Sequence, residues 1–292
     1  PEHTEKCEGY VVFGRRLFRC SHVHGPVRLK EAIARSCNVY FFHVAETVGM
    51  DRIAQVATSF GLGEKTGLGI NPEASGRIPT RSWYALRYRG QFRVGFTLNM
   101  AIGEGDVTVT PLQLAEAYAA LANGGTLYQP QVVRAVETSD GAVVQEFPPR
   151  IRRQIPVPPD DLRRIDDALY DVVNEPNGTA YPARDPTLDV AGKTGTAQTG
   201  YVAKKGEDPK MGSFLSRNHA WFSCFAPAHA PEIAVTVLVE HGGSGPEVAV
   251  PIAMQIVHEY ERLQAIRLGH APWPKMPTPK PKAPHGGGGV RP

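Results

Sequence analysis

Three short apolar segments in the last third of the chain constrain its fold most. They cover residues 188–198, 219–226 and 232–240, and each has the β-branched or alternating pattern that favours a strand. The second and third are joined by only five residues, PAHAP at 227–231. Because hairpin-length links join antiparallel strands, whereas parallel strands need a long crossover, this spacing predicts an antiparallel sheet.

Helical patterns precede and follow these strands. Helices are expected over residues 27–36, 38–48, about 51–60, 111–123, 160–173 and 248–268. Residues 126–147 read as two strand-like pieces around a turn, and residues 61–100, rich in Gly, Pro and Arg, are expected to be an extended loop. The order predicts an α/β (α+β) domain over 1–268, followed by a disordered Pro/Lys/Gly-rich tail at 269–292.

The overall composition excludes several classes of protein. With 41% hydrophobic and 21% charged residues, the 292-residue chain is globular. A net charge of +3 without a basic stripe gives no sign of nucleic-acid binding. No run approaches the roughly 20 apolar residues of a membrane helix. The chain starts at Pro1 rather than Met, so we interpret it as a fragment whose targeting and anchoring segments lie upstream.

The sequence DVAGKTGTAQTG at 189–200 contains a possible anion-binding strand. A phosphate-binding loop is disfavoured, because such a loop would need a glycine where Thr187 stands and a helix after the lysine. Lys193 is instead followed by Thr194, Gly195 and Thr196, and two hydroxyls beside one cation can hold a carboxylate. The simpler interpretation is an edge strand with an exposed lysine. A second Lys-Thr-Gly, at 65–67, follows a helix end and is interpreted as structural.

Ser36 and Asn38 in the stretch ARSCNVYFF complete a second motif. Ser-x-Asn followed by Lys-Thr-Gly-Thr resembles two of the three active-site motifs of penicillin-binding D,D-transpeptidases and serine β-lactamases. Longer stretches, including GEGDVTVTPLQLAEAYAALANGG, NGTA and HAWFSCFAP, are similar to elongation-type class B penicillin-binding proteins over roughly residues 15–265. One departure is Glu104, where relatives usually have glutamine.

The resemblance implies a penicillin-binding/serine β-lactamase-like fold, with helices on both faces of an antiparallel sheet, and an acyl-transfer activity. A serine attacks the D-Ala-D-Ala stem peptide of peptidoglycan, and the acyl-enzyme is passed to an amine of a neighbouring stem. Ser36 would relay a proton, and Asn38 would bind the substrate amide and orient the catalytic lysine. Lys193 would keep the local electrostatic field at the site positive. Thr194, Gly195 and Thr196 would bind the substrate, with the Thr196 N–H as an oxyanion donor.

The third motif of the family, Ser-x-x-Lys, is absent from these 292 residues. It supplies the nucleophile and lies upstream of Ser-x-Asn in the family. We therefore expect the fold to be incomplete at its N-terminal side and this fragment alone to be inactive.

Three cysteines and a histidine crowd the first 37 residues. The set Cys7, Cys20, His24 and Cys37 has the composition of a structural zinc site, with His22 as an alternative to His24. Some elongation-type relatives resemble it in carrying a metal-ligand set in this region. A Cys7–Cys20 disulfide and unbound buried thiols are the other interpretations. Zinc would be structural, since the chemistry requires no cofactor.

The resemblance also implies a setting and partners. The full-length protein is expected at the periplasmic face of the bacterial inner membrane, anchored by an N-terminal helix. Its expected partners are peptidoglycan stem peptides, β-lactams as inhibitors, and elongation-complex membrane proteins including a glycosyltransferase, with no nucleic acid. A non-catalytic scaffold of the same fold, or a serine β-lactamase, is the alternative. Arg87, Arg89 and Arg93 are interpreted as a solvated loop, with contact to the anionic cell-wall polymer as the alternative.

Overall fold

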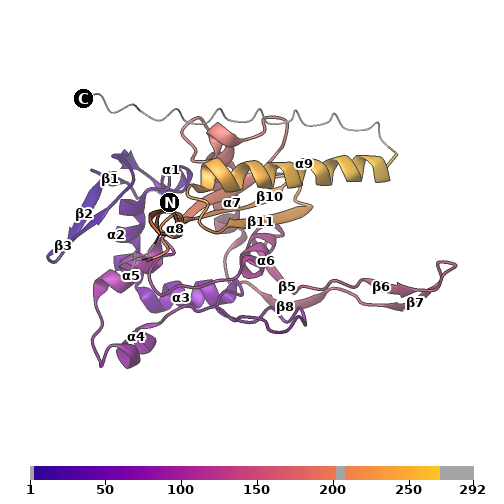
Figure 1. Ribbon diagram of the computed structural model, residues 1–292, viewed down its shortest axis with the longest axis horizontal. Helices are drawn as coiled ribbons and strands as arrows, with labels where there is room; N and C mark the ends of the chain where they lie inside the picture. The colour runs from indigo at the N-terminus through magenta and orange to yellow at the C-terminus, as the bar shows by residue number, and fades with distance from the viewer. Residues whose placement is uncertain (1–2, 202–207, 270–292) are drawn as a thin grey trace.

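A three-stranded antiparallel sheet forms the centre of the computed structural model, which describes residues 3–201 and 208–269. The strands lie in the order β11 (Ile233–Val239), β10 (His219–Ala226), β9 (Ala191–Ala197) (Figure 1). All three predicted strands and their antiparallel pairing are confirmed. Because β9 is an edge strand among the described residues, its outer row of backbone N–H and C=O groups has no partner in the sheet.

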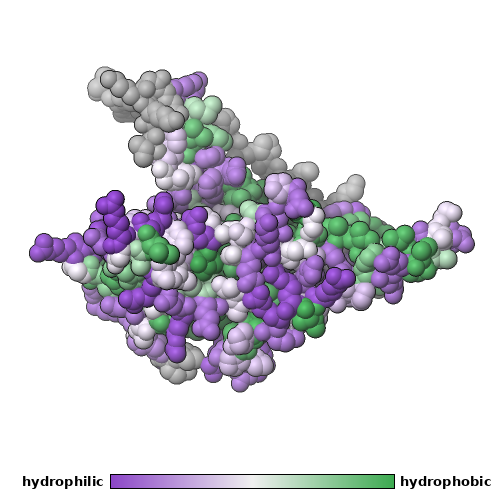
Figure 2. All heavy atoms as spheres, turned by 90° about the horizontal axis from the view of Figure 1, so that it is seen from below, coloured by the Kyte–Doolittle hydropathy of each residue, from purple (hydrophilic) through white to green (hydrophobic). Residues whose placement is uncertain are grey.

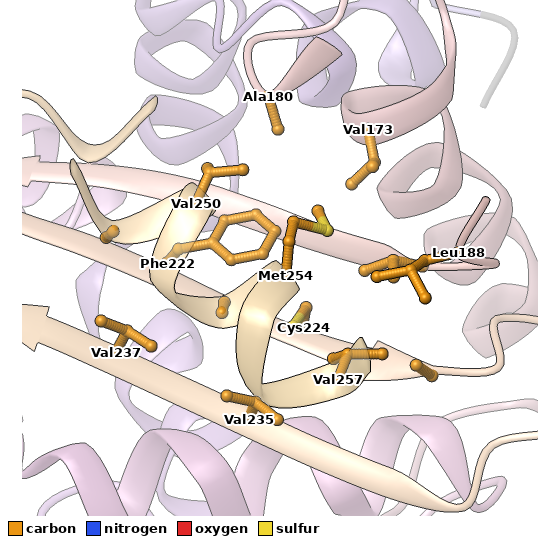
Figure 3. Packing of buried hydrophobic residues seen from close by; sticks show 14 of the residues in the cluster. Val173, Ala180, Leu188, Phe222, Cys224, Val235, Val237, Val250, Met254 and Val257 are labelled. Atoms are coloured by element: carbon orange, nitrogen blue, oxygen red, sulfur yellow. The ribbon is translucent and has the colours of Figure 1, made fainter. Parts of the chain in front are cut away.

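Both faces of the sheet are covered by helices, as expected. On one face, Phe222 and Met254 pack in a cluster between β10 and α9 (Val250–Arg267), and both side chains are almost fully buried (Figure 3). On the other face, Phe225 packs against Leu121 of α6 (Pro111–Ala122). The last five residues of β10 are all buried, because successive side chains point to opposite faces and both faces are covered.

The remaining helix beside the sheet is α7 (Pro159–Asn174), which contacts the edge strand β9. Its buried residues enter the clusters on both faces. Three short helices complete this half of the molecule: η1 (Tyr181–Ala183), α8 (Pro209–Leu215) and the single π-turn η2 (Gly245–Ala249).

The N-terminal region is a pair of small two-stranded sheets, which the sequence did not predict. In this region β1 pairs with β4 and β2 with β3, both antiparallel. The bounds of these strands and of the three helices after them are β1 (Glu5–Cys7), β2 (Tyr10–Phe13), β3 (Arg16–Arg19), β4 (Gly25–Val27), α1 (Leu29–Ala34), α2 (Asn38–Val48) and α3 (Met50–Ser59).

The expectation of an extended loop over 61–100 is wrong for its second half. Two helices form there, α4 (Arg81–Arg87) and α5 (Val94–Ala101). Both are short and lack a long periodic pattern, so they depend on packing rather than on local propensity. The Tyr84 and Phe96 rings stack across them with centroids 4.1 Å apart.

A long two-stranded arm projects from the body (Figure 1). β5 (Thr126–Gln129) pairs with β8 (Arg150–Gln154), and farther out β6 (Ala135–Glu137) pairs with β7 (Val143–Glu146). Its valines are exposed, and Figure 2 shows hydrophobic side chains gathered along the arm.

Across residues 3–201 and 208–269, no helix has both the length and the apolar character that crossing a bilayer requires. The tail predicted to be disordered lies outside the described residues, apart from Gly269.

Candidate active site

Ser36 and Lys193 meet, although 157 positions separate them in the chain. The Lys193 ammonium on β9 donates a hydrogen bond to the Ser36 hydroxyl. It also donates to the Thr194 carbonyl at 3.3 Å. The two motifs quoted from opposite ends of the sequence therefore form one polar cluster between the end of α1 and the edge of the sheet.

The backbone around Ser36 fixes the direction of its side chain. Ser36 is one of three non-glycine residues with positive φ among the described residues, at 52°. Such left-handed conformations are uncommon for serine and are held by their surroundings. Here Ser36 N–H donates to the Ile33 carbonyl at 3.2 Å, and Thr179 N–H donates to the Ala34 carbonyl at 3.1 Å. The turn after α1 is thus tied to the segment that follows α7.

Burial changes the acidity of Lys193. Desolvation lowers the pKa of its ammonium to about 8, because the charged form loses contact with water. At neutral pH Lys193 is mainly protonated, and it becomes neutral only a little above that. It can therefore act as a cation and as a proton donor to Ser36 under ordinary conditions.

The hydroxyls that follow Lys193 have different surroundings. Thr194 shares a 2.8 Å hydrogen bond with Thr179, which comes from the NGTA segment. Thr196 is exposed, and its hydroxyl accepts from Gly245 N–H at 3.4 Å. Both side chains lie on the same face of β9, because residues two apart on a strand point the same way. Thr196 is the more accessible of the two for a ligand.

The packing around Gly195 is tight in the structure. A Cβ atom at this position would lie 3.0 Å from the Trp221 Cβ on the neighbouring strand. Gly245 also lies close to this strand, because a Cβ added at Gly245 would lie 2.4 Å from the Gly195 carbonyl oxygen. The protein's own chain therefore crowds Gly195.

Asn38 is close in sequence to Ser36 but has another partner. Its side-chain amide donates to the Arg19 carbonyl of β3 at 3.2 Å. Within the described residues it makes no hydrogen bond to Ser36 or Lys193. In this conformation Asn38 ties the start of α2 to the N-terminal strands.

Glu104 contacts the chain just beyond the C-terminal end of β9. Its carboxylate accepts from the Gln198 N–H, just after β9, at 3.3 Å. Burial raises the pKa of Glu104 above its ordinary value, and the Gln198 N–H partly opposes that shift. The acid that replaces the expected glutamine therefore holds the loop after α5 to the end of β9.

The four predicted metal ligands converge in one cluster. The ligand atoms of Cys7, Cys20, His24 and Cys37 all lie within 4.8 Å of one another. His24 Nδ1 is 3.6 Å from the Cys7 sulfur and 3.5 Å from the Cys20 sulfur. All four cysteines of the chain are free thiols in the structure. The fourth, Cys224, is buried in the core, as expected.

The cluster also contacts the Ser-x-Asn turn directly. Asn38 N–H donates to the Cys20 sulfur at 3.2 Å. A hydrogen bond from the Cys37 thiol, and to a lesser extent nearby backbone N–H groups, lower the pKa of Cys20 below its ordinary value. Proximity to Cys20 and burial raise the pKa of Cys37. The arrangement favours a thiolate at Cys20, which is the form that binds metal.

Comparison with known proteins identifies the family. The penicillin binding protein transpeptidase domain matches residues 1–258, which is most of the chain. The chain belongs to the penicillin-binding protein transpeptidase family. This confirms the resemblance drawn from the motifs and the fold that it implied.

Individual members of this transpeptidase family show the same likeness. A peptidoglycan D,D-transpeptidase MrdA from Haemophilus influenzae is 35% identical over 259 residues, which are 85% of this chain and 39% of that protein. PBP2 of Pseudomonas aeruginosa in complex with WCK 5153 has a TM-score of 0.72 and 33% identity, covering 89% of this chain and 56% of that one. The PBP2–MreC complex from Helicobacter pylori has a TM-score of 0.74 and 28% identity, covering 92% and 46%. The chain thus spans well under two thirds of these relatives.

Two contacts in the site were not predicted from the sequence. Thr179 touches Thr194, and the Arg19 carbonyl holds Asn38. In the sequence, the NGTA segment that contains Thr179 indicated only a similarity to the family and no contact with Thr194. The Arg19 contact uses a backbone carbonyl, which no residue pattern reveals.

Proposed function

We propose that this chain is the C-terminal portion of the transpeptidase domain of a peptidoglycan D,D-transpeptidase of cell elongation, acting through a serine acyl-enzyme. The observation that carries the proposal is the hydrogen bond from the Lys193 ammonium to the Ser36 hydroxyl. A hydroxyl held by a buried ammonium is the arrangement that moves protons in Ser-Lys acyl-transfer sites. Family membership and the MrdA relatives support the same reaction.

The nucleophile of the proposed reaction comes from outside this chain. None of the 292 residues is a serine followed three positions later by lysine. The proposal assigns the Ser-x-x-Lys motif to an upstream part of the full-length protein and expects this chain alone not to acylate.

Ser36 and Lys193 assist proton transfer to the leaving amine in the proposed mechanism. When the nucleophilic serine attacks the carbonyl of the penultimate D-Ala, the departing D-Ala amine needs a proton. The lysine of the upstream Ser-x-x-Lys motif takes the proton that the nucleophile loses and gives a proton to Ser36. The Ser36 hydroxyl passes its own proton to the departing amine, while the Lys193 ammonium stabilises the hydroxyl oxygen. The amine of a second stem peptide then takes the acyl group, and the proton returns by the same route.

The edge of β9 binds the donor strand in this proposal. Thr196 is exposed, and no further strand pairs with the outer edge of β9 among the described residues. An extended peptide can pair with such an edge. The Thr194 and Thr196 hydroxyls, with Lys193, bind the terminal carboxylate, and the Thr196 N–H contributes to the oxyanion hole. Asn38 must exchange its Arg19 contact for the substrate amide.

We also propose that Cys7, Cys20, His24 and Cys37 hold a structural zinc ion. A sulfur and a nitrogen on one tetrahedral zinc lie about 3.6 Å apart, given bond lengths of about 2.3 and 2.0 Å. The two sulfur–nitrogen distances in the cluster, 3.6 and 3.5 Å, fit that value. Two buried thiols and one half-buried thiol beside one buried imidazole, without a disulfide, also suit a metal.

The zinc proposal predicts a metal content that depends on three thiols and not on the fourth. The full-length protein is expected to contain about one equivalent of zinc, lost in Cys37→Ala and kept in Cys224→Ala, whose thiol is equally buried but remote from the cluster. Elemental analysis with thiol titration measures this. Metal-free wild-type protein with a Cys7–Cys20 disulfide would refute the zinc site.

The proposed setting follows from the family. A cell-wall transpeptidase works where its polymer is, so we assign the full-length protein to the periplasmic face of the inner membrane, with an upstream anchor. One structural relative was solved with MreC, and another belongs to a peptidoglycan synthase complex. We propose membrane proteins of the elongation machinery, including a glycosyltransferase, as partners.

A fluorescent penicillin distinguishes the proposed function from its rivals. The full-length protein is expected to become covalently labelled and to release the label slowly. Absence of labelling would indicate a non-catalytic scaffold, and rapid release with hydrolysed drug would indicate a β-lactamase. Either result would overturn the proposal.

A further inference from the structure

A lobe built around α4 carries an unusual concentration of positive charge. Residues 74–103, which we call the arginine lobe, contain five arginines and no aspartate, glutamate or lysine. All five arginines are exposed: Arg77, Arg81, Arg87, Arg89 and Arg93. α4 lies at the lower edge of Figure 1, on the side from which Figure 2 is viewed.

Aromatic rings hold three of these guanidinium groups in place. Arg77 and Arg87 lie over the Trp83 ring, 5.1 and 5.9 Å from its centroid. Arg81 lies 4.5 Å from the centroid of Phe92. Stacking on a ring orders a guanidinium while leaving its N–H edge free for an acceptor.

The arginines of the lobe have no carboxylate partner within the part of the chain that the structure describes. Asp51 accepts a hydrogen bond from the Arg81 main-chain N–H and not from its guanidinium. Two exposed arginines of α7, by contrast, are paired: Arg163 with Asp160, and Arg164 with Asp161. Five unpaired cations, three of them ordered by aromatic rings, create a local positive field at this surface.

The loop after α5 connects the lobe to the candidate active site. A Cβ at Gly105 would lie 3.9 Å from the Tyr84 hydroxyl, so this loop rests on the lobe's aromatic core. The preceding residue, Glu104, accepts from Gln198 N–H at the end of β9. A polymer bound at the edge of β9 can therefore extend onto the lobe.

We infer that the arginine lobe binds the peptidoglycan strand outside the catalytic groove, through the free carboxylates of its stem peptides. Arginine pairs with carboxylate in a two-pronged geometry, and a polymer that repeats carboxylates along its length suits cations spread over one surface. The inference rests on the proposed function, because it takes the same polymer as substrate. The link to β9 favours this polymer over anionic lipid.

Binding to purified peptidoglycan sacculi tests the lobe. In the full-length protein, Arg87→Gln with Arg89→Gln removes two unpaired cations. Arg163→Gln with Arg164→Gln removes the same charge from exposed paired sites and serves as control. The lobe variant is expected to bind sacculi roughly three- to ten-fold more weakly, and the control to bind as wild type. The difference should shrink in high salt.

Two further arms identify the ligand. Sacculi whose carboxylates have been converted to amides are expected to bind the lobe variant and wild type equally. Vesicles rich in phosphatidylglycerol are expected to bind neither. Equal sacculus binding by the two double variants, an undiminished difference on amidated sacculi, or lobe-dependent binding to the vesicles alone would overturn the inference.

Acylation by a fluorescent penicillin separates this inference from the proposed function. Penicillin is too small to reach the lobe, so both double variants are expected to acylate like wild type. A wild-type protein that penicillin does not acylate would refute the proposed function. Normal acylation with no lobe-dependent sacculus binding would refute only the inference.

Discussion

At the scale of single residues, Ser36 and Lys193 show how much could be predicted from the sequence. Their motifs predicted that a hydroxyl and a cation belong to one site, and the structure brings the two side chains together. The contacts of Asn38 and Thr194 could not be predicted, because their partners are a backbone carbonyl and a hydroxyl distant in sequence. Motif spacing identifies side chains, but it does not give their rotamers.

The lowered pKa of Lys193 predicts a pH dependence. Burial brings this pKa to about 8, so the ammonium is lost as the pH rises through 8. Acylation of the full-length protein by penicillin is expected to decline above about pH 8, because the neutral amine no longer supports Ser36. Rate constants between pH 6 and 10 measure this. Lys193→Arg should move the decline upward by more than one pH unit, and an unmoved decline would assign it to another group.

At the scale of elements, long segments with a clear period were predicted best. The strands β9 to β11 and the helices α6 and α9 appear where the sequence placed them. The helices α4 and α5 were missed because aromatic packing, rather than an amphipathic pattern, stabilises them. The strands β1 to β4 were missed because each has only three or four residues.

Gly192 gives a prediction for the strand that carries Lys193. A Cβ at this position would lie 2.6 Å from both the Cys224 Cβ and the Ser223 carbonyl oxygen. Gly192→Ala should therefore push β9 off β10 and cost roughly 2–3 kcal/mol of unfolding free energy. Gly195→Ala, on the same strand, meets only the Trp221 Cβ at 3.0 Å and should cost less. Denaturant unfolding compares the two, and the reverse order would contradict the packing described for β9.

At the scale of the whole molecule, the helices that cover the sheet were predicted, but the projecting arm was not. The family resemblance implied helices on both faces of the sheet, and helices cover both faces. The projecting arm could not be foreseen, because strand-like valines give no sign that nothing packs on them. Only tertiary contacts decide whether such a strand joins the core.

The contrast between core and arm predicts a difference in stability. Phe222 is fully buried between β10 and α9, so Phe222→Ala should cost roughly 3–5 kcal/mol (Figure 3). Val144 on the arm is 65% exposed, so Val144→Ala should stay within about 0.5 kcal/mol. Unfolding followed by near-UV circular dichroism measures both. Similar costs for the two variants would place the core elsewhere.

The most direct test of the account measures what Ser36 does for acylation. The second-order rate constant for penicillin acylation of the full-length protein is compared between wild type, Ser36→Ala and Ser139→Ala, an exposed serine in the arm's turn. Loss of a proton relay predicts a fall of about 100-fold or more for Ser36→Ala and no change for Ser139→Ala. Equal rates for wild type and Ser36→Ala would contradict the role assigned to the Ser36–Lys193 pair.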